Sequence, residues 1–215
     1  MPAINTILFD LDGTLIDSIE LILASYRHTL AAHGRQPLPD SEWMRGVGTP
    51  LRVQLAQCAE SPEDLQALVE TYRDYNLANH DRMITAYPGV VDMVRTVRSM
   101  GFHTGVVTSK NREGTRRGLR LVGLEDFIEV RVCADDVTHP KPHPEPVLQA
   151  LTRLGANPAN TLFVGDSVHD LHSGRQAGVL TGAALWGPFQ REELEPAAPD
   201  HWLASVPDLR SLLGL

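Results

Sequence analysis

Short apolar runs rich in β-branched residues alternate with helical patterns, and this alternation limits the possible folds more than any other feature of the chain. Five runs are long enough for one strand each: TILFD (6–10), FHTGVVTS (102–109), FIEVRVC (127–133), TLFVGD (161–166) and TGAALW (181–186). Helical patterns occupy 89–100, 112–122, 144–154 and 169–177. Strands that alternate with helices predict a mostly parallel sheet covered by helices on both faces. We therefore expect an α/β fold with a Rossmann-like, doubly wound core.

One long stretch interrupts this alternation. From Asp17 to about His80 the sequence shows helical periodicity and no convincing strand. The alternation resumes at Pro88-Gly89, a dipeptide typical of a turn. We therefore expect an all-helical cap domain inserted after the first strand. The predicted boundaries are 17–83 for this cap domain, and 1–16 with 84–215 for the α/β core.

Capping signals mark the ends of the helices in this insertion. Asp17 or Ser18 is suited to cap the first helix, because both side chains accept hydrogen bonds from free backbone N–H groups. Ser61-Pro62-Glu63-Asp64 combines a capping residue, a proline at the first helical position and acids in the first turn. The sequence therefore predicts another helix that begins after Ser61.

Charge and composition exclude several classes of protein. The chain has 215 residues and a net charge of −8, with no Lys/Arg cluster, so we expect no nucleic-acid partner. No apolar run approaches the roughly 20 residues needed to span a bilayer, so we expect no membrane association. The N-terminus lacks the features of a signal peptide, and Cys58 and Cys133 form no C-x-x-C motif. These features favour a cytoplasmic protein with reduced thiols.

Polar residues follow four of the predicted strands. They are Asp10 with Asp12, Thr108 with Ser109, Asp135 with Asp136, and Asp166. In parallel sheets of this kind, ligands bind in the crevice at the carboxyl ends of the strands. The sequence therefore predicts a site at this edge, to which distant segments contribute.

Two of these residues, Asp10 and Asp12, are only two positions apart. In an extended segment such side chains face the same way, about 6–7 Å apart. Their repulsion would be roughly 2–3 kcal/mol at an effective dielectric constant of about 20, and Asp166 would increase it. A divalent cation between the carboxylates replaces this repulsion with attraction, and carboxylate oxygens suit Mg²⁺. Gly13 allows the backbone to approach a ligand closely. We therefore expect Mg²⁺ as the cofactor.

Four motifs carry a resemblance to a known family. FDLDGTLIDS (9–18) resembles the first signature of the haloacid dehalogenase superfamily of phosphohydrolases, D-x-D-G-T-[LV]-x-D-S. GVVTSKNR, HPKPHPEPVLQAL and GDSVHD resemble its second, third and fourth motifs, in the family's order. The inserted helical segment resembles the cap found in this superfamily between the first two motifs. Together these features span essentially the whole chain.

The resemblance implies roles for the aspartates. Asp10 would be the nucleophile that forms an aspartyl-phosphate, and Asp12 the general acid and base. Mg²⁺ would be held by Asp10, the backbone carbonyl of Asp12 and Asp166. Asp170 would either support this metal site or anchor Lys141.

It also implies residues that bind the phosphoryl group and the rest of the substrate. The Thr108 hydroxyl and the Lys141 ammonium would hold the phosphoryl oxygens, and a backbone N–H group near Ser109 would add to them. Arg45 or Arg52, in the segment MRGVGTPLR, would contact the anionic remainder of the substrate. The implied partner is a small phosphorylated metabolite, and the chain would act as a monomer or homodimer.

Several functions are compatible with these motifs and this fold. The third motif most resembles phosphoglycolate phosphatases and the related pyrophosphatase branch, so we expect Mg²⁺-dependent hydrolysis of a small phosphomonoester. Inorganic pyrophosphatase remains an alternative, as does a β-phosphoglucomutase-like phosphotransferase, although Gly165 stands where that branch has an acid. A non-enzymatic alternative is a phospho-accepting signalling module. A transition-metal site at His169 and His172 is also considered, but the helix motif expected of such a site is absent.

Overall fold

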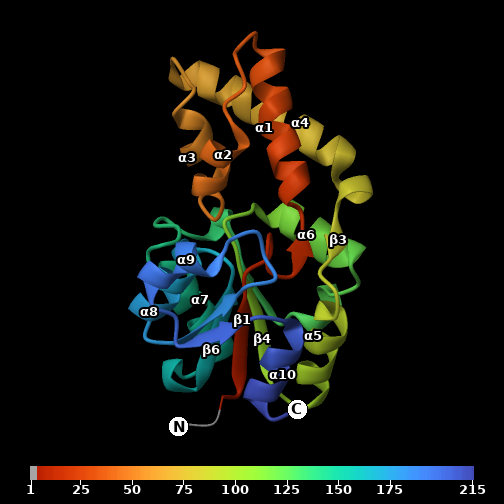
Figure 1. Ribbon diagram of the computed structural model, residues 1–215, viewed down its shortest axis with the longest axis vertical. Coiled ribbons are helices and arrows are strands. Elements are labelled where there is room, and N and C mark those ends of the chain that lie inside the picture. Colours follow the sequence, from red (N-terminus) through yellow and green to blue (C-terminus); the bar gives the residue numbers. More distant parts are fainter. Residues whose placement is uncertain (1–3) are drawn as a thin grey trace.

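A six-stranded sheet forms the centre of the protein, as seen in the computed structural model, which describes residues 4–215 (Figure 1). Its strand order is β5-β4-β1-β6-β7-β8, and every neighbouring pair is parallel. The predicted α/β class with a parallel sheet is therefore confirmed. Residues 201–203 form a sixth strand in addition to the five apolar runs named above. The strands are β1 (Thr6–Phe9), β4 (His103–Val107), β5 (Val130–Val132), β6 (Thr161–Gly165), β7 (Leu180–Ala184) and β8 (His201–Leu203).

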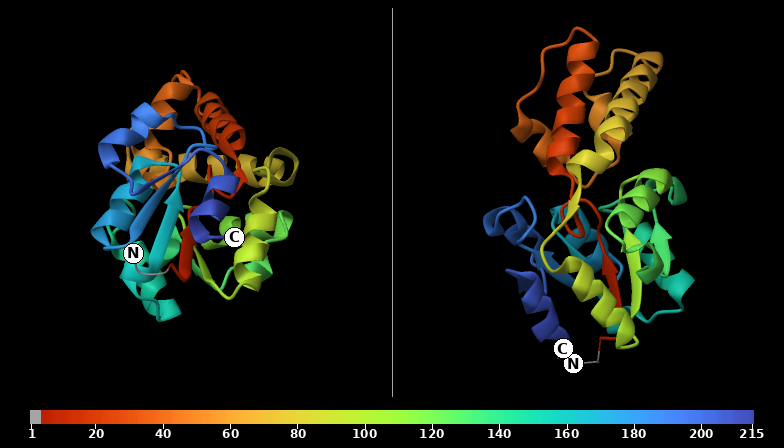
Figure 2. Two further views of the ribbon diagram at one scale, coloured as in Figure 1. Left: turned by 60° about the horizontal axis from the view of Figure 1, so that its bottom comes forward. Right: turned by 90° about the vertical axis from the view of Figure 1, so that its right-hand side faces the viewer.

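Helices cover both faces of this sheet (Figures 1 and 2). In β1, Ile7 packs into the cluster on one face and Leu8 into the cluster on the other, because successive side chains point to opposite faces. The first face carries α5 (Val90–Ser99), α6 (Arg112–Leu121) and α10 (Val206–Leu213). The second carries α7 (Glu145–Leu154), whose apolar side chains join that cluster, and α8 (Val168–Gln176), which packs against Phe163 and Ala183. The chain after β4 also contains the short helix α9 (Arg191–Leu194) and the 3₁₀ turns Glu125–Phe127, Ala134–Asp136, Pro158–Asn160 and Glu195–Ala197.

The segment between the first strand and α5 forms a separate group of helices beyond the carboxyl edge of the sheet (Figure 2, right). It has its own apolar cluster, in which the rings of Tyr26 and Trp43 stack at 4.0 Å and Tyr72 packs beside them. Its helices are α1 (Ile19–Ala32), α2 (Asp40–Gly46), α3 (Leu51–Ala56) and α4 (Pro62–Met83). We call this group the helical insertion; its predicted boundaries as a domain stay a prediction. Across residues 4–215, no helix combines the length and apolarity needed to cross a membrane.

Two very short strands connect the insertion to the sheet, and the sequence analysis missed both. β2 (Ile16–Asp17) pairs antiparallel with β3 (Thr85–Ala86). Strands of two residues are too short to show a period in sequence. Of the two predicted capping residues, Ser18 occupies the cap position of α1, although its side chain makes no capping hydrogen bond, and Asp17 lies in β2. Ser18 Oγ instead donates a hydrogen bond to Asp12 Oδ1 (2.5 Å).

The cap predicted at Ser61 is confirmed, since Ser61 Oγ accepts a hydrogen bond from the backbone N–H of Asp64 (3.1 Å). We expect Ser61→Ala to lower the free energy of unfolding by about 1 kcal/mol, because it leaves an N–H group of α4 unpaired. Urea denaturation measures this change. Ser41→Ala is the matched control, at an exposed position inside α2, and should change stability by less than about 0.5 kcal/mol. Equal effects of both substitutions would contradict the capping role.

Candidate active site

The carboxyl ends of three neighbouring strands bring Asp10, Thr108 and Asp166 together. Phe9, the last residue of β1, is in register with Val106 of β4 and Val164 of β6. The three polar residues therefore leave the sheet at similar heights. Asp10 is 4% exposed, Thr108 5% and Asp166 1%. The structure thus unites residues that lie far apart in the sequence, at the edge where the sequence predicted a site.

Lys141 enters this site from the loop before α7. Its Nζ lies 2.9 Å from Asp10 Oδ1 and 2.5 Å from Asp170 Oδ1, and it donates to the Val107 carbonyl at 3.3 Å. Burial alone would lower the pKa of Lys141, but the charges of Asp10 and Asp170 outweigh it and raise the pKa above its ordinary value. Lys141 is therefore a permanent cation beside the Asp10 carboxylate.

Three buried carboxylates surround this single ammonium. Asp10, Asp166 and Asp170 each offer an oxygen, and these oxygens lie within 4.8 Å of one another. Burial raises the pKa of Asp10 to about 7, although the charge of Lys141 opposes the shift. Burial and the charges of Asp170 and Asp10 raise the pKa of Asp166 well above its usual range. With all three ionised, the cluster has a net charge of −2 that these four side chains leave uncompensated.

A divalent cation fits this cluster. Within the described residues, Asp166 Oδ2 is buried and has no hydrogen-bond partner, while Thr14 Oγ1 donates to the other oxygen, Asp166 Oδ1 (2.6 Å). An unpaired buried carboxylate oxygen is costly unless a ligand contacts it. The donors available are hard carboxylate oxygens, which suit Mg²⁺. The residues present therefore agree with the predicted metal.

Two glycines keep space around Asp166. A Cβ atom on Gly13 would lie 2.4 Å from Asp166 Oδ2, and one on Gly187 would lie 2.6 Å from Asp166 Cβ. Gly13 has a φ of +88°, which other residues rarely adopt. The sequence analysis identified Gly13 but missed Gly187, which follows β7 outside any motif that we recognised. The backbone at Gly13 and at Gly187 therefore approaches the Asp166 carboxylate closely because neither residue has a side chain.

Asp170 contacts Lys141 directly. Its second oxygen, Oδ2, accepts hydrogen bonds from the Ser167 backbone N–H (3.0 Å) and from Ser167 Oγ (2.5 Å). These contacts fix the Asp170 side chain at the start of α8 and orient it toward the ammonium. They agree with the anchoring role that the sequence left open, while the position of Asp170 in the carboxylate cluster keeps the metal-site alternative open.

Asp12 lies outside that cluster and has a different partner. Both of its carboxylate oxygens accept hydrogen bonds from Lys110 Nζ, at 2.8 and 3.0 Å. The sequence analysis did not single out Lys110. The available signal was its position, two residues after Thr108 in the second motif, because such a residue leaves the sheet beside the other site residues.

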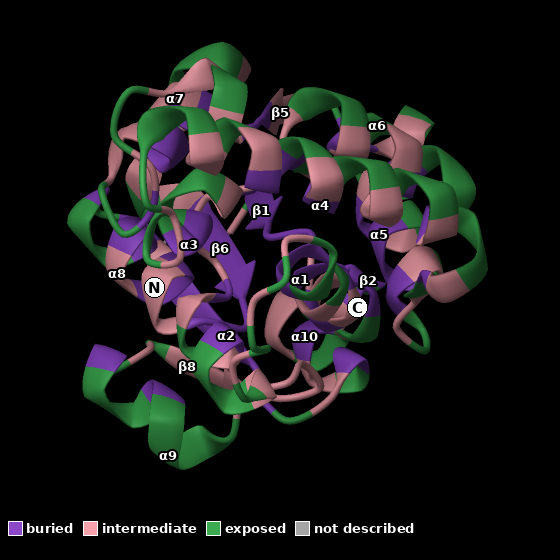
Figure 3. Ribbon diagram, turned by 90° about the horizontal axis from the view of Figure 1, so that it is seen from above, coloured by how far each residue is buried: buried purple, intermediate pink, exposed green. Residues whose placement is uncertain are grey.

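A cavity of about 450 Å³ lies between the helical insertion and the sheet. Figure 3 views the molecule from above, with the buried strands β1 and β6 near its middle. From the core, the cavity is lined by residues including Asp10, Asp12, Thr108, Ser109 and Lys110. From the insertion, it is lined by residues including Tyr26, Gln54, Tyr72 and His80. The predicted catalytic residues therefore face a space that both parts of the chain enclose.

The loop between α2 and α3, residues 47–50, closes one side of this cavity against the core. Ser109 Oγ donates a hydrogen bond to the Gly48 carbonyl (2.6 Å). A Cβ on Gly48 would lie 2.8 Å from Ser167 Oγ and 3.2 Å from His169 Cδ2. The sequence predicted that a backbone N–H group near Ser109 binds phosphate. The Ser109 side chain itself contacts the helical insertion.

The two predicted specificity arginines lie in different places. Arg52 lines the cavity, where its Nη1 donates to Gln66 Oε1 (2.6 Å). The Arg45 side chain is 73% exposed and pairs with Glu42 (2.7 Å) on α2. Arg52 therefore borders the cavity, whereas Arg45 points to a neighbour on its own helix, and substrate contact by either residue stays a prediction.

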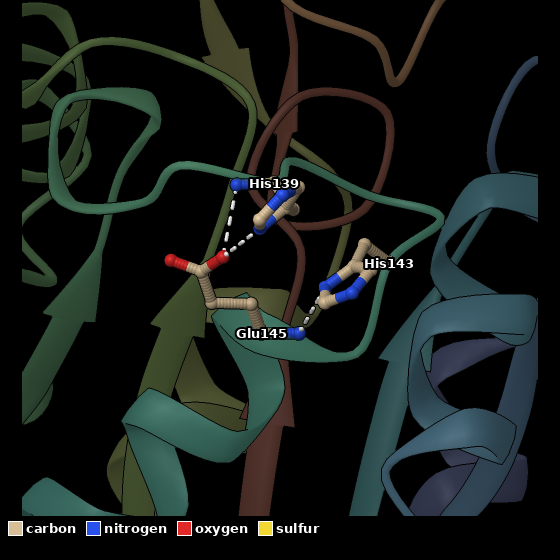
Figure 4. A group of neighbouring side chains, drawn as sticks. All are labelled: His139, His143 and Glu145. Atoms are coloured by element: carbon tan, nitrogen blue, oxygen red, sulfur yellow. Dashed lines mark hydrogen bonds and ion pairs between the residues drawn. The ribbon is translucent and has the colours of Figure 1, made fainter.

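The loop that carries Lys141 is organised by His139, His143 and Glu145 (Figure 4). The Glu145 carboxylate accepts hydrogen bonds from the backbone N–H groups of Thr138 (2.8 Å) and His139 (2.9 Å), and from His139 Nδ1 (2.9 Å). The Glu145 N–H donates to His143 Nδ1 (3.1 Å). These donors hold the pKa of Glu145 down, at about 2. All of these hydrogen bonds join residues 138–145, so they fix the chain on either side of Lys141.

Known proteins share both the sequence and the fold. Residues 7–184 match the model of the haloacid dehalogenase-like hydrolase family. The pyrophosphatase PpaX of Anoxybacillus flavithermus is 42% identical over 99% of this chain and 98% of its own length, and that of Halalkalibacterium halodurans is 39% identical over the same shares.

Solved structures agree. A hydrolase from Pseudomonas syringae aligns with a TM-score of 0.87 at 26% identity, covering 98% of each chain. A predicted phosphoglycolate phosphatase from Haemophilus somnus aligns with a TM-score of 0.89 over 99% of each chain, and at 22% identity this likeness concerns the fold alone. These matches are to an enzyme family and favour a hydrolase over the alternative of a phospho-accepting signalling module. The chain belongs to the haloacid dehalogenase-like hydrolases, the family that its four motifs predicted.

Proposed function

We propose that the protein is a Mg²⁺-dependent phosphatase that acts on a small phosphorylated metabolite through an aspartyl-phosphate. The observation that carries this proposal is the buried cluster, in which the Asp10 carboxylate lies against Lys141 and beside the unpartnered Asp166 Oδ2. Such a cluster offers a nucleophile, a fixed cation for phosphoryl oxygens and a cation site within one small volume.

Inorganic pyrophosphate is the substrate that we propose first. The motifs favoured a phosphoglycolate-like monoester, with pyrophosphate as an alternative. Relatives about 40% identical over nearly the whole chain carry the name pyrophosphatase, and this favours the alternative. The cations that line the cavity in addition to the catalytic cluster also suit a substrate with charge at both ends; they are Arg52, Arg73, Lys110 and Arg117.

In the proposed reaction, an Asp10 carboxylate oxygen attacks phosphorus and the bond to the leaving oxygen breaks. Lys141 and the Thr108 hydroxyl hold the phosphoryl oxygens as charge moves onto them. Asp12 gives a proton to the leaving oxygen and later takes one from the water that hydrolyses the aspartyl-phosphate. Mg²⁺, held by Asp10, Asp166 and the backbone carbonyl of Asp12, would neutralise charge between the nucleophile and the anionic substrate.

We expect Asp10→Asn to lower kcat by roughly 10³-fold or more, because an amide oxygen is a poor nucleophile. Phosphate release from pyrophosphate and from p-nitrophenyl phosphate, each with Mg²⁺ and with EDTA, measures the change. Asp126→Asn is the matched control, since Asp126 is exposed and outside the cavity. Turnover by Asp10→Asn at the wild-type rate would refute the mechanism.

Metal binding has a readout that does not depend on turnover. Mg²⁺ at about tenfold its Kd should raise the Tm of the wild-type protein by roughly 3–6 °C, because it binds only the folded state. Asp166→Asn removes the unpartnered oxygen and should abolish this shift. Asp126→Asn should keep it. A full Mg²⁺-dependent shift in Asp166→Asn would place the metal elsewhere.

The 47–50 loop gives a further prediction. Gly48→Ala places a Cβ 2.8 Å from Ser167 Oγ at a φ of +97°, so the loop must move away from the core. We expect kcat/KM for pyrophosphate to fall roughly 10- to 100-fold, because misplacement of about 1 Å near a reacting centre has effects of this size. Gly34→Ala is a matched control: its φ is +67° and a Cβ there meets nothing within 4 Å. Equal activities of the two variants would show that the loop contact is not needed.

A further inference from the structure

We infer that Lys110 selects substrates whose leaving group already carries a negative charge, by exchanging its contact with Asp12 for a contact with that leaving group. This inference rests on the proposed phosphatase function and adds a substrate class to it. It assigns a specificity-determining role to a residue that the sequence analysis did not single out.

The position of Lys110 follows from its contact with Asp12. Its Nζ lies within 3.0 Å of both Asp12 carboxylate oxygens, one of which must reach the leaving oxygen to protonate it. A leaving group that receives a proton from Asp12 is therefore also within reach of the Lys110 ammonium. Both side chains line the cavity and are mostly buried, at 13% exposure for Lys110 and 16% for Asp12. A charge contact in this setting is screened less than one on the surface.

The backbone of Lys110 is fixed in relation to the phosphoryl site. Its N–H donates to Thr108 Oγ1 (3.2 Å), and its carbonyl accepts a hydrogen bond from the Ala134 N–H (2.9 Å). The first of these partners is the hydroxyl predicted to hold the transferring phosphoryl group. The Lys110 backbone is therefore fixed, and rotation about the side-chain bonds moves the ammonium from Asp12 to a neighbouring anion.

Asp12 keeps a second partner when Lys110 moves. Ser18 Oγ donates to Asp12 Oδ1 at 2.5 Å from the start of α1. The carboxylate thus remains in place while the ammonium contacts the substrate. This separates two functions at one position: Ser18 holds Asp12, and Lys110 is free to neutralise the charge of the leaving group.

Two other cations of the cavity, Arg52 and Arg117, are held by partners on α4, and Arg73 lines the cavity from an exposed position on that helix. Arg117 forms two hydrogen bonds with Asp81, at 2.9 and 3.0 Å. Arg52 donates to Gln66 and is exposed. Lys110 is the cation that contacts Asp12, so the charge of the leaving group meets Lys110 first.

For pyrophosphate the balance is simple. Asp10 forms a bond to one phosphorus atom, and the bond from that atom to the bridging oxygen breaks. The electron pair stays on the bridging oxygen, which takes the Asp12 proton and departs as inorganic phosphate. Its other oxygens are charged throughout, and Lys110 stabilises them as the negative charge grows. A neutral leaving group offers Lys110 no such partner, so the ammonium stays on Asp12.

The test compares substrates whose leaving groups differ in charge, and phosphoglycolate and 2-hydroxyethyl phosphate form the pair that is also similar in size. Pyrophosphate and phosphoglycolate have charged leaving groups, whereas 2-hydroxyethyl phosphate and p-nitrophenyl phosphate have neutral ones. Lys110→Met should lower kcat/KM for the charged pair roughly 10- to 100-fold more than for the neutral pair, as expected for the loss of a charge-assisted contact. Lys110→Arg should restore at least part of the preference. Arg120→Met, which removes a charge outside the main cavity, should leave the preference unchanged.

Each remaining outcome counts against one idea. Equal losses for all four substrates in Lys110→Met would overturn the inference and leave Lys110 as a residue that only positions Asp12. A wild-type enzyme that hydrolyses the neutral pair but not the charged pair would also overturn it, while the phosphatase proposal would stand. No Mg²⁺-dependent hydrolysis of any of the four would instead overturn the proposed function.

Discussion

The arrangement of the site depends on one electrostatic imbalance, three buried carboxylates against one buried ammonium. Lys141 contacts Asp10 and Asp170, but no cation among the described residues contacts Asp166, whose Oδ2 has no hydrogen-bond partner. Burying charges without partners costs several kcal/mol per ion. Burial therefore raises the pKa of Asp10 and of Asp166, and a divalent cation bound here would favour their charged forms.

The parallel sheet makes this imbalance possible. Three adjacent strands, β4, β1 and β6, end at one edge and deliver Thr108, Asp10 and Asp166, which lie far apart in the sequence. The strands are buried on both faces, so their backbones do not move to relieve repulsion. Glycines complete the approach: Gly13 and Gly187 allow backbone to pass where any side chain would strike Asp166. Rigidity of the sheet therefore maintains a charge distribution that a flexible loop would relax.

Sequence patterns predicted what depends on local order, and failed where a residue's partner is distant. The strand–helix alternation and the Ser61 cap were readable because each follows from nearby residues. The side-chain capping bond of Ser18 is absent for the opposite reason, since its Oγ contacts Asp12 in place of its own helix. Lys110 was missed because an isolated lysine carries no pattern until the fold brings Asp12 to it. Gly187 gave no signal because its importance comes from the proximity of Asp166.

Asp12 links these features to the choice of substrate. It is two residues from Asp10 in sequence, yet its side chain belongs to a separate group with Ser18 and Lys110. The site thus has two cations with different neighbours: Lys141 beside Asp10, the proposed nucleophile, and Lys110 beside Asp12, the proposed proton donor. In the proposed reaction, a substrate with charge only on its transferring phosphoryl group would need the first cation, whereas a diphosphate would engage both. The 47–50 loop contacts the core through Ser109, the neighbour of Lys110, so the loop contact and the residue proposed to recognise the leaving group lie in one turn after β4. We therefore expect the insertion to favour substrates small enough to lie between these two cations.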